Sequence, residues 1–329
     1  HCSNPSPYSV SVTIGHNRRP TRTQGKHMAG KGDSTRAILY ALGANFAIFA
    51  TKLFAAVLTT SGAMMAEAVH SLADCGNQTL LLWGLKRSKR PPTPDFPLGF
   101  GKAIYFWSFL VALMLFSVGG MFSLYEGLHK LQHPEPLRLP WLAVGVLAFG
   151  IVAESYSMWG CLREVNKSRG DQSLWRWFRD SRQSELIVIF GEDLAALFGL
   201  SFALVAILLT MATGNPAYDA YGTLGIGVLL IVVAVFISVE VKALLIGQSA
   251  DPALDHQLRT LIEQQPEVKR VFNLITLQLG NDVMLAAKIE LATNGSMEEA
   301  CAAINRVEVE VRRQHPQIRF SFVEPDTLD

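Results

Sequence analysis

The chain has 329 residues, of which 50% are hydrophobic and 17% are charged, and its formal net charge is +1. Soluble globular domains average about 25% charged residues, so this composition argues against an ordinary soluble enzyme. The small net charge argues against a nucleic-acid partner. The four cysteines form no Cys-X-X-Cys pair, which excludes a zinc-finger spacing and gives no disulfide framework.

Residues 1–36 form a polar N-terminal segment that we expect to be disordered. The first 27 residues are rich in Arg, Pro and Ser and lack the apolar core of a secretory signal. Met28 is a candidate true start of the protein. An organelle-targeting role for residues 1–27 is the alternative.

Six apolar segments are long enough to cross a hydrocarbon core of about 30 Å, which takes roughly 20 helical residues. They define a predicted six-helix transmembrane domain over residues 37–247. The predicted spans lie near residues 37–59, 62–84, 103–127, 139–162, 185–211 and 217–240.

Basic residues gather after the second and fourth spans, whereas the alternate linkers carry few or none. These basic residues are Lys86, Arg87, Lys89 and Arg90, then Arg163, Lys167, Arg169, Arg176, Arg179 and Arg182. Because cytoplasmic loops of membrane proteins are enriched in Lys and Arg, this pattern predicts that both termini are cytoplasmic.

Residues 251–329 have the mixed polarity of a water-soluble domain. We expect the order αββαβ, with a hairpin turn at Gly280–Asn281–Asp282. The predicted elements are a helix near 252–265, strands over 268–279 and 283–291, a helix near 297–313 and a strand over 318–323. This order predicts a small two-layer α+β cytoplasmic domain, and dimerisation would help to bury its core.

The second predicted span carries a row of polar side chains. Glu67, His70 and Asp74 are spaced i, i+3 and i+7, so they share one helix face. Asn77 and Gln78 extend this row by a further turn. Because burying an ionisable group inside a bilayer costs free energy, Glu67, His70 and Asp74 are candidates for function. We expect Glu67, Asn77 and Gln78 to support the metal ligands or to line the ion pathway.

The fifth predicted span contains Glu192 and Asp193 between apolar residues. At 1.5 Å of rise per helical residue, Asp74 lies roughly 19 Å and Asp193 about 18 Å from the outer face, so the two carboxylates reach one level. With His70 one turn outward, an imidazole and carboxylates together are typical of a zinc site. The competing interpretation of such residues is polar contact between helices.

Two more ionisable residues lie in the predicted spans. Lys52 in the first span has a depth similar to that of Glu67, and we favour a structural ion pair between them. Glu154 in the fourth span lies near the cytoplasmic third, where it either lines a pathway or extends towards water.

Four motifs resemble the cation diffusion facilitator family of zinc transporters, and the resemblance extends from about residue 36 to the end. They are HSLADCGNQ at 70–78, FPLGFGKA at 96–103, GNPAYDAYGTLGIG at 214–227 and FVEPD at 322–326. FGEDLAALFG at 190–199 is most similar to the branch that contains a mitochondrial zinc transporter and its bacterial relatives.

The resemblance implies a homodimeric, proton-coupled antiporter that exports Zn²⁺ from the cytoplasm by alternating access. It implies no enzymatic activity and no prosthetic group, with Zn²⁺ as the transported substrate. His70, Asp74 and Asp193 match three of the family's four metal ligands. The usual histidine of the fifth helix falls at Ile189, so Glu192 is the candidate fourth ligand.

The resemblance also implies a metallochaperone-like cytoplasmic domain, but one without a binuclear zinc centre. Positions that bind zinc in other members are Phe272, Glu290 and Val323 here. In the loop before the third span Asp95 is kept, whereas Phe100 stands where many members have His. We expect His256 and His315 to be solvent-exposed residues at helix ends.

Three alternatives stay open. The same fold could transport Mn²⁺, Co²⁺, Fe²⁺ or Cd²⁺, or it could serve as a non-transporting regulatory homologue. An intramembrane metalloenzyme is disfavoured because the chain lacks HExxH and an evident nucleophile arrangement. For location we favour a bacterial cytoplasmic membrane, with an organellar membrane as the alternative.

Overall fold

The structure is a computed structural model, and it describes residues 31–292 and 295–327. The candidate start Met28 and most of the expected polar segment therefore lie outside the described residues. Residues 31–36 belong to the first helix, so that helix begins earlier than the sequence predicted. The chain divides into two units, residues 1–40 and 41–329, and the packing below concerns the second.

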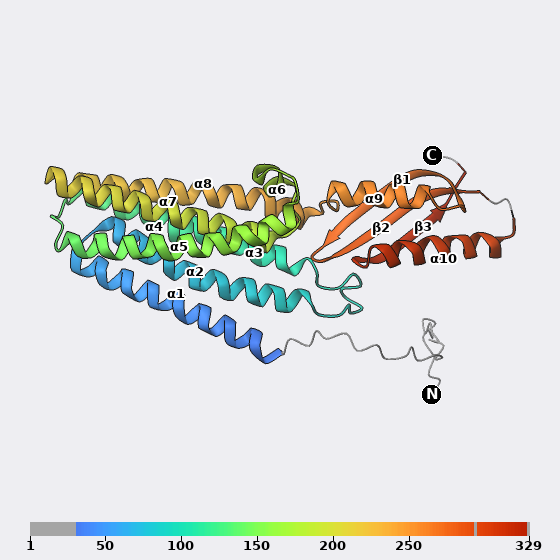
Figure 1. The fold of residues 1–329 in the computed structure, drawn as a ribbon, viewed down its shortest axis with the longest axis horizontal. Helices are drawn as coiled ribbons and strands as arrows, with labels where there is room; N and C mark the ends of the chain where they lie inside the picture. The colour runs from blue at the N-terminus through green and yellow to red at the C-terminus, as the bar shows by residue number, and fades with distance from the viewer. Residues whose placement is uncertain (1–30, 293–294, 328–329) are drawn as a thin grey trace, which may run out of the picture. The chain divides into compact units, whose positions relative to one another are not determined.

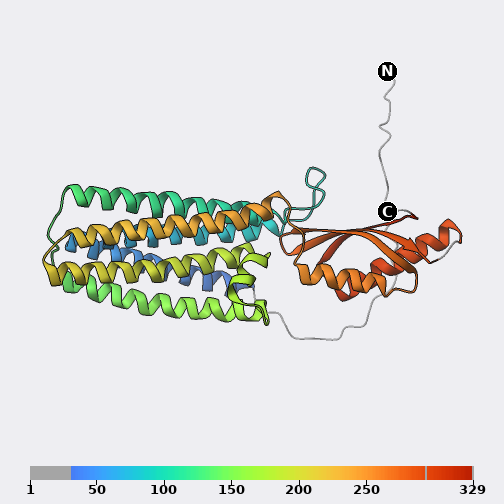
Figure 2. The same ribbon diagram turned by 90° about the horizontal axis from the view of Figure 1, so that it is seen from above.

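Helices, most of them long, form the part of the chain before residue 247 (Figures 1 and 2). They are α1 (Lys31–Thr59), α2 (Gly62–Ser88), α3 (Ala103–Met114), the π-helical η1 (Leu115–Met121), α4 (Phe122–Gln132), α5 (Pro140–Arg169), α6 (Leu174–Asp180), α7 (Ser184–Thr213) and α8 (Ala217–Ile246). The longer ones extend past the predicted spans at one or both ends, because helices continue beyond the apolar stretch that marks them in the sequence.

Four helical stretches in the described part of the chain are long and apolar enough to cross a membrane. They are Ala103–Gln132, Pro140–Arg169, Ser184–Thr213 and Ala217–Ile246. Among the residues whose side chains are described, α1 contributes a shorter apolar stretch, Asn45–Thr59, and α2 carries the row of polar side chains described above. The molecule is thus a largely helical membrane protein.

Small residues let the helices approach closely. On α8, a side-chain carbon added to Gly227 would lie 2.9 Å from the Leu124 backbone nitrogen and 3.0 Å from the Gly120 carbonyl oxygen. Such contacts between backbones are typical of helix packing in membranes, where glycine removes the steric obstacle. Helices α4 and α8 are consequently packed against each other along their length.

Two local features were not predicted. The π-helical turn η1 interrupts the third long helix where Gly119 and Gly120 face α8, and such turns often mark functional sites. The short helix α6 forms within the basic linker after α5. The Ser173 side chain accepts a hydrogen bond from the Arg176 backbone there, and Trp177 is buried in an apolar cluster of its own.

The chain after residue 251 folds into helix α9 (Pro252–Glu263), strands β1 (Val268–Leu279) and β2 (Asp282–Leu291), helix α10 (Met297–Gln314) and strand β3 (Ile318–Pro325). The strand order is β1-β2-β3, with an antiparallel first pair and a parallel second pair. Gly280 turns the hairpin with a φ of 71°, which favours glycine. A parallel pair needs a crossover, and α10 supplies it.

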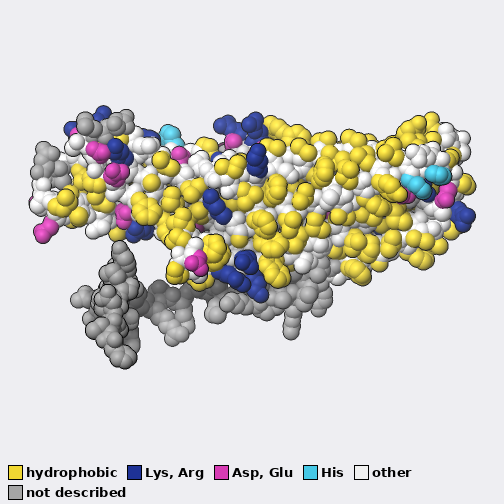
Figure 3. Space-filling view, turned by 180° about the vertical axis from the view of Figure 1, so that it is seen from behind, with side chains coloured by type: hydrophobic (Ala, Val, Ile, Leu, Met, Phe, Trp, Pro, Cys, Tyr) yellow, Lys and Arg dark blue, Asp and Glu magenta, His cyan; other side chains and the backbone are white. Residues whose placement is uncertain are grey.

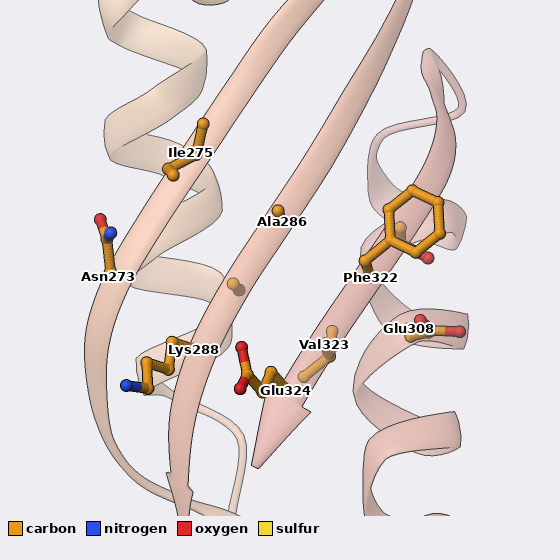
Figure 4. Close-up of a pocket in the computed structure, with 10 residues that line it drawn as sticks. Asn273, Ile275, Ala286, Lys288, Glu308, Phe322, Val323 and Glu324 are labelled. Carbon is orange, nitrogen blue, oxygen red and sulfur yellow. The ribbon is translucent and has the colours of Figure 1, made fainter. Parts of the chain in front are cut away.

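The two helices α9 and α10 share an apolar core with the sheet, separate from the core of the long helices. Ile275 and Phe322 instead stay exposed on the sheet, beside a hollow of about 480 Å³ (Figure 4).

His256 is exposed, as expected. The expectation for His315 was wrong: it is half-buried because the chain turns there from α10 into β3.

The positions where the resemblance implied zinc ligands in other proteins have other contacts in this structure. The Glu290 carboxylate pairs with Lys269 at 2.5 Å and with Arg270 at 3.6 Å. The guanidinium of Arg270 also lies 4.3 Å from the centre of the Phe272 ring. Val323 packs against the apolar core of the sheet.

Candidate metal site within the helices

The start of α2 is fixed by a carboxylate from α8. Asp219 accepts hydrogen bonds from the Gly62 backbone nitrogen at 2.7 Å and from the Ser61 hydroxyl at 2.6 Å. Ser61 in turn accepts a hydrogen bond from the Met64 backbone, which caps the helix. Because the first turn is held in this way, the rotation of α2 and the direction of its polar row are set.

His70 and Asp74 form the centre of that row. The His70 Nδ1 lies 3.7 Å from the Asp74 Oδ1, and the imidazole is 1% exposed. Among the described residues, neither ring nitrogen of His70 nor the Asp74 Oδ1 has a hydrogen-bond partner. A buried polar atom without a partner costs about 1–3 kcal/mol. The pair therefore has the donor atoms and the unmet bonding capacity that a bound cation or a proton would satisfy.

Glu192 faces this row from α7. Its Oε1 accepts a hydrogen bond of 2.6 Å from the Asn77 Nδ2, and its side chain is buried. Asn77 continues the face of α2 that carries His70 and Asp74, and its own Oδ1 has no partner among the described residues. Glu192 is thus the carboxylate of α7 that is in contact with the polar row of α2.

Asp193 faces a different helix. Its Oδ2 accepts a hydrogen bond of 3.2 Å from the Ser157 hydroxyl on α5. Neighbouring residues of a helix point about 100° apart, so Glu192 and Asp193 face different partners. Ile189, where the resemblance implied a missing histidine, is 39% exposed. Within residues 31–292 and 295–327, no three His, Cys, Asp or Glu side chains gather closely enough to hold a metal ion.

Lys52 brings a positive charge from α1 to the same face of α2. Its Nζ lies 3.2 Å from the Glu67 Oε2 and donates a hydrogen bond of 2.8 Å to the Ser71 hydroxyl. Both charged side chains are buried. The other oxygen of Glu67 lies directly against Gly199 on α7, where a side-chain carbon would occupy the same space. The Lys52–Glu67 pair therefore depends on three helices.

The two remaining sequence candidates lie at the edge of this network. Gln78 is half-buried on α2. Glu154 is half-buried on α5 and close enough to interact electrostatically with Lys52, His70 and Asp74. Glu154 therefore joins the same charged interior from the side of α5.

The sequence reasoning did not single out three residues that the structure places here: Ser71, Ser157 and Asp219. Asp219 could have been found, because it is an ionisable residue in a predicted span. The two serines have no signal in the sequence, since serine is common in membrane helices and only its neighbours give it a role.

The chain was compared with protein families and with curated proteins. Residues 38–246, more than half of the chain, match the family model described as the Cation efflux transmembrane domain. The chain is 34% identical over 269 residues to the "Proton-coupled zinc antiporter SLC30A9, mitochondrial" of Xenopus laevis, covering 81% of this chain and 48% of that protein. It is 32% identical over 269 residues to the human protein of that name, covering 81% and 47%.

A plant protein is also similar. The "Metal tolerance protein C4" of Arabidopsis thaliana is 32% identical over 224 residues, with 66% of this chain and 48% of that protein covered. The chain spans about half the length of these curated relatives. The family description and the SLC30A9 names describe transporters rather than enzymes. The family match shows that the chain belongs to the cation efflux family, also called the cation diffusion facilitators.

Proposed function

We propose that the chain is a proton-coupled antiporter that exports Zn²⁺ from the cytoplasm. The observation that carries the proposal is the buried His70–Asp74 pair, whose donor atoms lack partners among the described residues. The names of the SLC30A9 relatives, which describe proton-coupled zinc antiporters, support the same substrate.

The proposed site combines His70 and Asp74 of α2 with the carboxylates of Glu192 and Asp193 of α7. Glu192 already faces α2 through Asn77, so we assign it the place of the missing fifth-helix histidine. Asp193 would have to leave Ser157 to join the site, which is a rearrangement within the α5–α7 contact. Alternating access supplies such a rearrangement, because one state of the cycle need not assemble every ligand.

Exchange with protons follows from the chemistry of the ligands. The ring nitrogen and the carboxylate oxygens bind either a proton or a metal ion, so Zn²⁺ binding at His70 and Asp74 displaces protons. Protonation from the opposite side then releases the metal. Glu154 and Gln78 lie beside this site, where we propose that they line the path of the ions.

The finer points of the fold belong to the same proposal. We propose six spans, with α1 and α2 added to the four apolar stretches, and both termini in the cytoplasm. The domain after residue 251 would then be a cytoplasmic αββαβ domain of the metallochaperone type. Its exposed Ile275 and Phe322 support a homodimer, since a second copy would cover them.

A flux assay tests the function. The full chain is reconstituted into liposomes with a proton gradient, and Zn²⁺ uptake is measured with a trapped fluorescent indicator. We expect Asp74→Asn to abolish uptake and the matched exposed carboxylate change Glu164→Gln to leave it intact. Wild-type uptake by Asp74→Asn would contradict the proposed site.

The same assay separates the alternatives. Uptake of Mn²⁺, Co²⁺, Fe²⁺ or Cd²⁺ in preference to Zn²⁺ would establish another substrate for the same site. Wild-type protein that binds metal but moves none would support a regulatory homologue. As to location, the mitochondrial relatives favour an organellar membrane over a bacterial cytoplasmic membrane.

A further inference from the structure

A pair of histidines that the transport site does not use lies at the end of α4. His129 is in the last turn of the helix, and His133 is the residue that caps it. Both side chains are exposed. Their ring centres lie 4.9 Å apart and the ring planes are inclined by 30°. In Figure 3, histidine side chains lie next to each other at one end of the helical region, with acidic and basic side chains close by.

The surroundings of this pair favour a cation. The last carbonyl groups of a helix have no partners within the helix and carry partial negative charge, which attracts cations. The one basic neighbour on this turn, Lys130, is engaged elsewhere. Its Nζ donates a hydrogen bond of 2.8 Å to the Thr60 carbonyl and lies 3.4 Å from Glu135. The ammonium group is therefore held at the turn before α2.

The i, i+4 spacing suits chelation of a transition metal once the two exposed rings, which are stacked in this structure, turn so that a nitrogen of each faces the ion. Two histidines at i and i+4 on one helix face form the metal-binding half of the H-E-x-x-H motif. Imidazole ligands suit Zn²⁺, Cu²⁺ and Ni²⁺, whereas Mg²⁺ and Ca²⁺ prefer oxygen ligands. No third His, Cys, Asp or Glu gathers with the pair in the described residues, so water would complete the coordination, as in open zinc sites.

We infer that His129 and His133 form a second binding site for a divalent transition-metal cation, on the surface at the end of α4. Lys130 and Thr60 place this surface at the end of the bundle where α2 begins. In the proposed topology that end faces away from the cytoplasm, on the side where the metal would be released. The position on the release side rests on the proposed function, whereas the binding of metal does not.

Titration calorimetry with Zn²⁺ alone tests the site on the full chain in lipid nanodiscs. The background carries Asp74→Asn, which disables the interior candidate site. We expect this background to bind Zn²⁺ in one event, and we expect that event to be lost when His129→Gln and His133→Gln are added. Because both side chains are exposed, these changes should leave the fold and the thermal unfolding curve intact.

The matched control is His256→Gln, which removes an exposed histidine on α9 that has no histidine four residues away. We expect unchanged Zn²⁺ binding. As a second readout, Zn²⁺ should protect His129 and His133, but not His256, from acylation by diethyl pyrocarbonate, detected by peptide mass spectrometry. Equal Zn²⁺ binding with and without the histidine pair, or no binding in the Asp74→Asn background, would overturn the inference. If the wild-type protein failed to transport Zn²⁺, the calorimetric and protection results for the histidine pair would not be affected. The two proposals can therefore fail separately.

Discussion

Asn77 and Glu192 connect α2 to α7 through a hydrogen bond of 2.6 Å in the buried interior. The bond holds the Glu192 carboxylate of α7 against the row of polar side chains on α2. It therefore couples the half of the candidate site that carries His70 and Asp74 to the half contributed by α7.

Asn77→Ala should lower Zn²⁺ affinity about 10–100-fold, the range found when a residue that orients a metal ligand is removed. The physical reason is that Glu192 would lose the donor that fixes its carboxylate. Titration of the purified protein with Zn²⁺ measures the effect. Thr79→Ala, an exposed change two residues away on α2, is the control. Equal affinities for the two variants would rule out an orienting role for Asn77.

Lys52→Met should destabilise the protein by about 3–5 kcal/mol, because it leaves the Glu67 carboxylate buried without its partner. The double change Lys52→Met with Glu67→Gln should recover most of this loss, since no uncompensated charge remains. Thermal unfolding in detergent gives the comparison.

The surface pair of Lys167 and Glu164 provides the control for the buried pair. Its atoms approach to 2.7 Å, yet both side chains are well exposed. Lys167→Met should therefore change stability by at most about 1 kcal/mol. If Lys52→Met were as mild as Lys167→Met, the interior pair would have no structural importance.

Gly199→Ala should destabilise the protein by about 1–3 kcal/mol, the usual range for overpacking. The added methyl group would occupy the space of the Glu67 carboxylate oxygen and push it away from Lys52. Gly225→Ala is a close match, because Gly225 is also in a long helix but has no atom within 4 Å of the added carbon. The difference in Tm between the two variants is the measurement, and no difference would refute the contact.

Asp219→Ala should weaken the start of α2 by about 1–3 kcal/mol, because the Gly62 backbone N–H loses its acceptor in a buried position. Hydrogen exchange of the first turn of α2 should rise in the same variant. Asp251→Ala is the comparison, because the Asp251 carboxylate caps the start of another helix, α9, by accepting a hydrogen bond from the Ala253 backbone. Unchanged hydrogen exchange in the first turn of α2 would show that Asp219 does not stabilise the N-terminal end of that helix.

Acid should weaken the contact between α10 and the start of β1. The hydrogen bond from Arg306 lowers the pKa of Glu267, so the stabilisation is present above the ordinary glutamate pKa. It is lost as the pH falls through the lowered value. Arg306→Met should bring the Glu267 pKa back up, as measured by carboxyl NMR titration. If the titration curve of Glu267 were the same in Arg306→Met, Arg306 would be excluded as the cause of the lowered Glu267 pKa.

Much of the architecture could be predicted from the sequence because hydropathy and hydrogen-bond chemistry act locally. The long apolar stretches, the Gly280 turn and the order of elements after residue 251 each depend on neighbours along the chain. The polar row of α2 could also be predicted, since helical spacing alone puts Glu67, His70 and Asp74 on one face.

The structure alone decided which neighbour each polar residue meets. Glu192 and Asp193 are adjacent in sequence, yet one faces Asn77 on α2 and the other faces Ser157 on α5. The packing of α7 between those helices sets that choice, because a turn of 100° per residue separates the two directions. The π-helical turn η1 and the role of Gly199 likewise depend on contacts between distant segments, which no local pattern records.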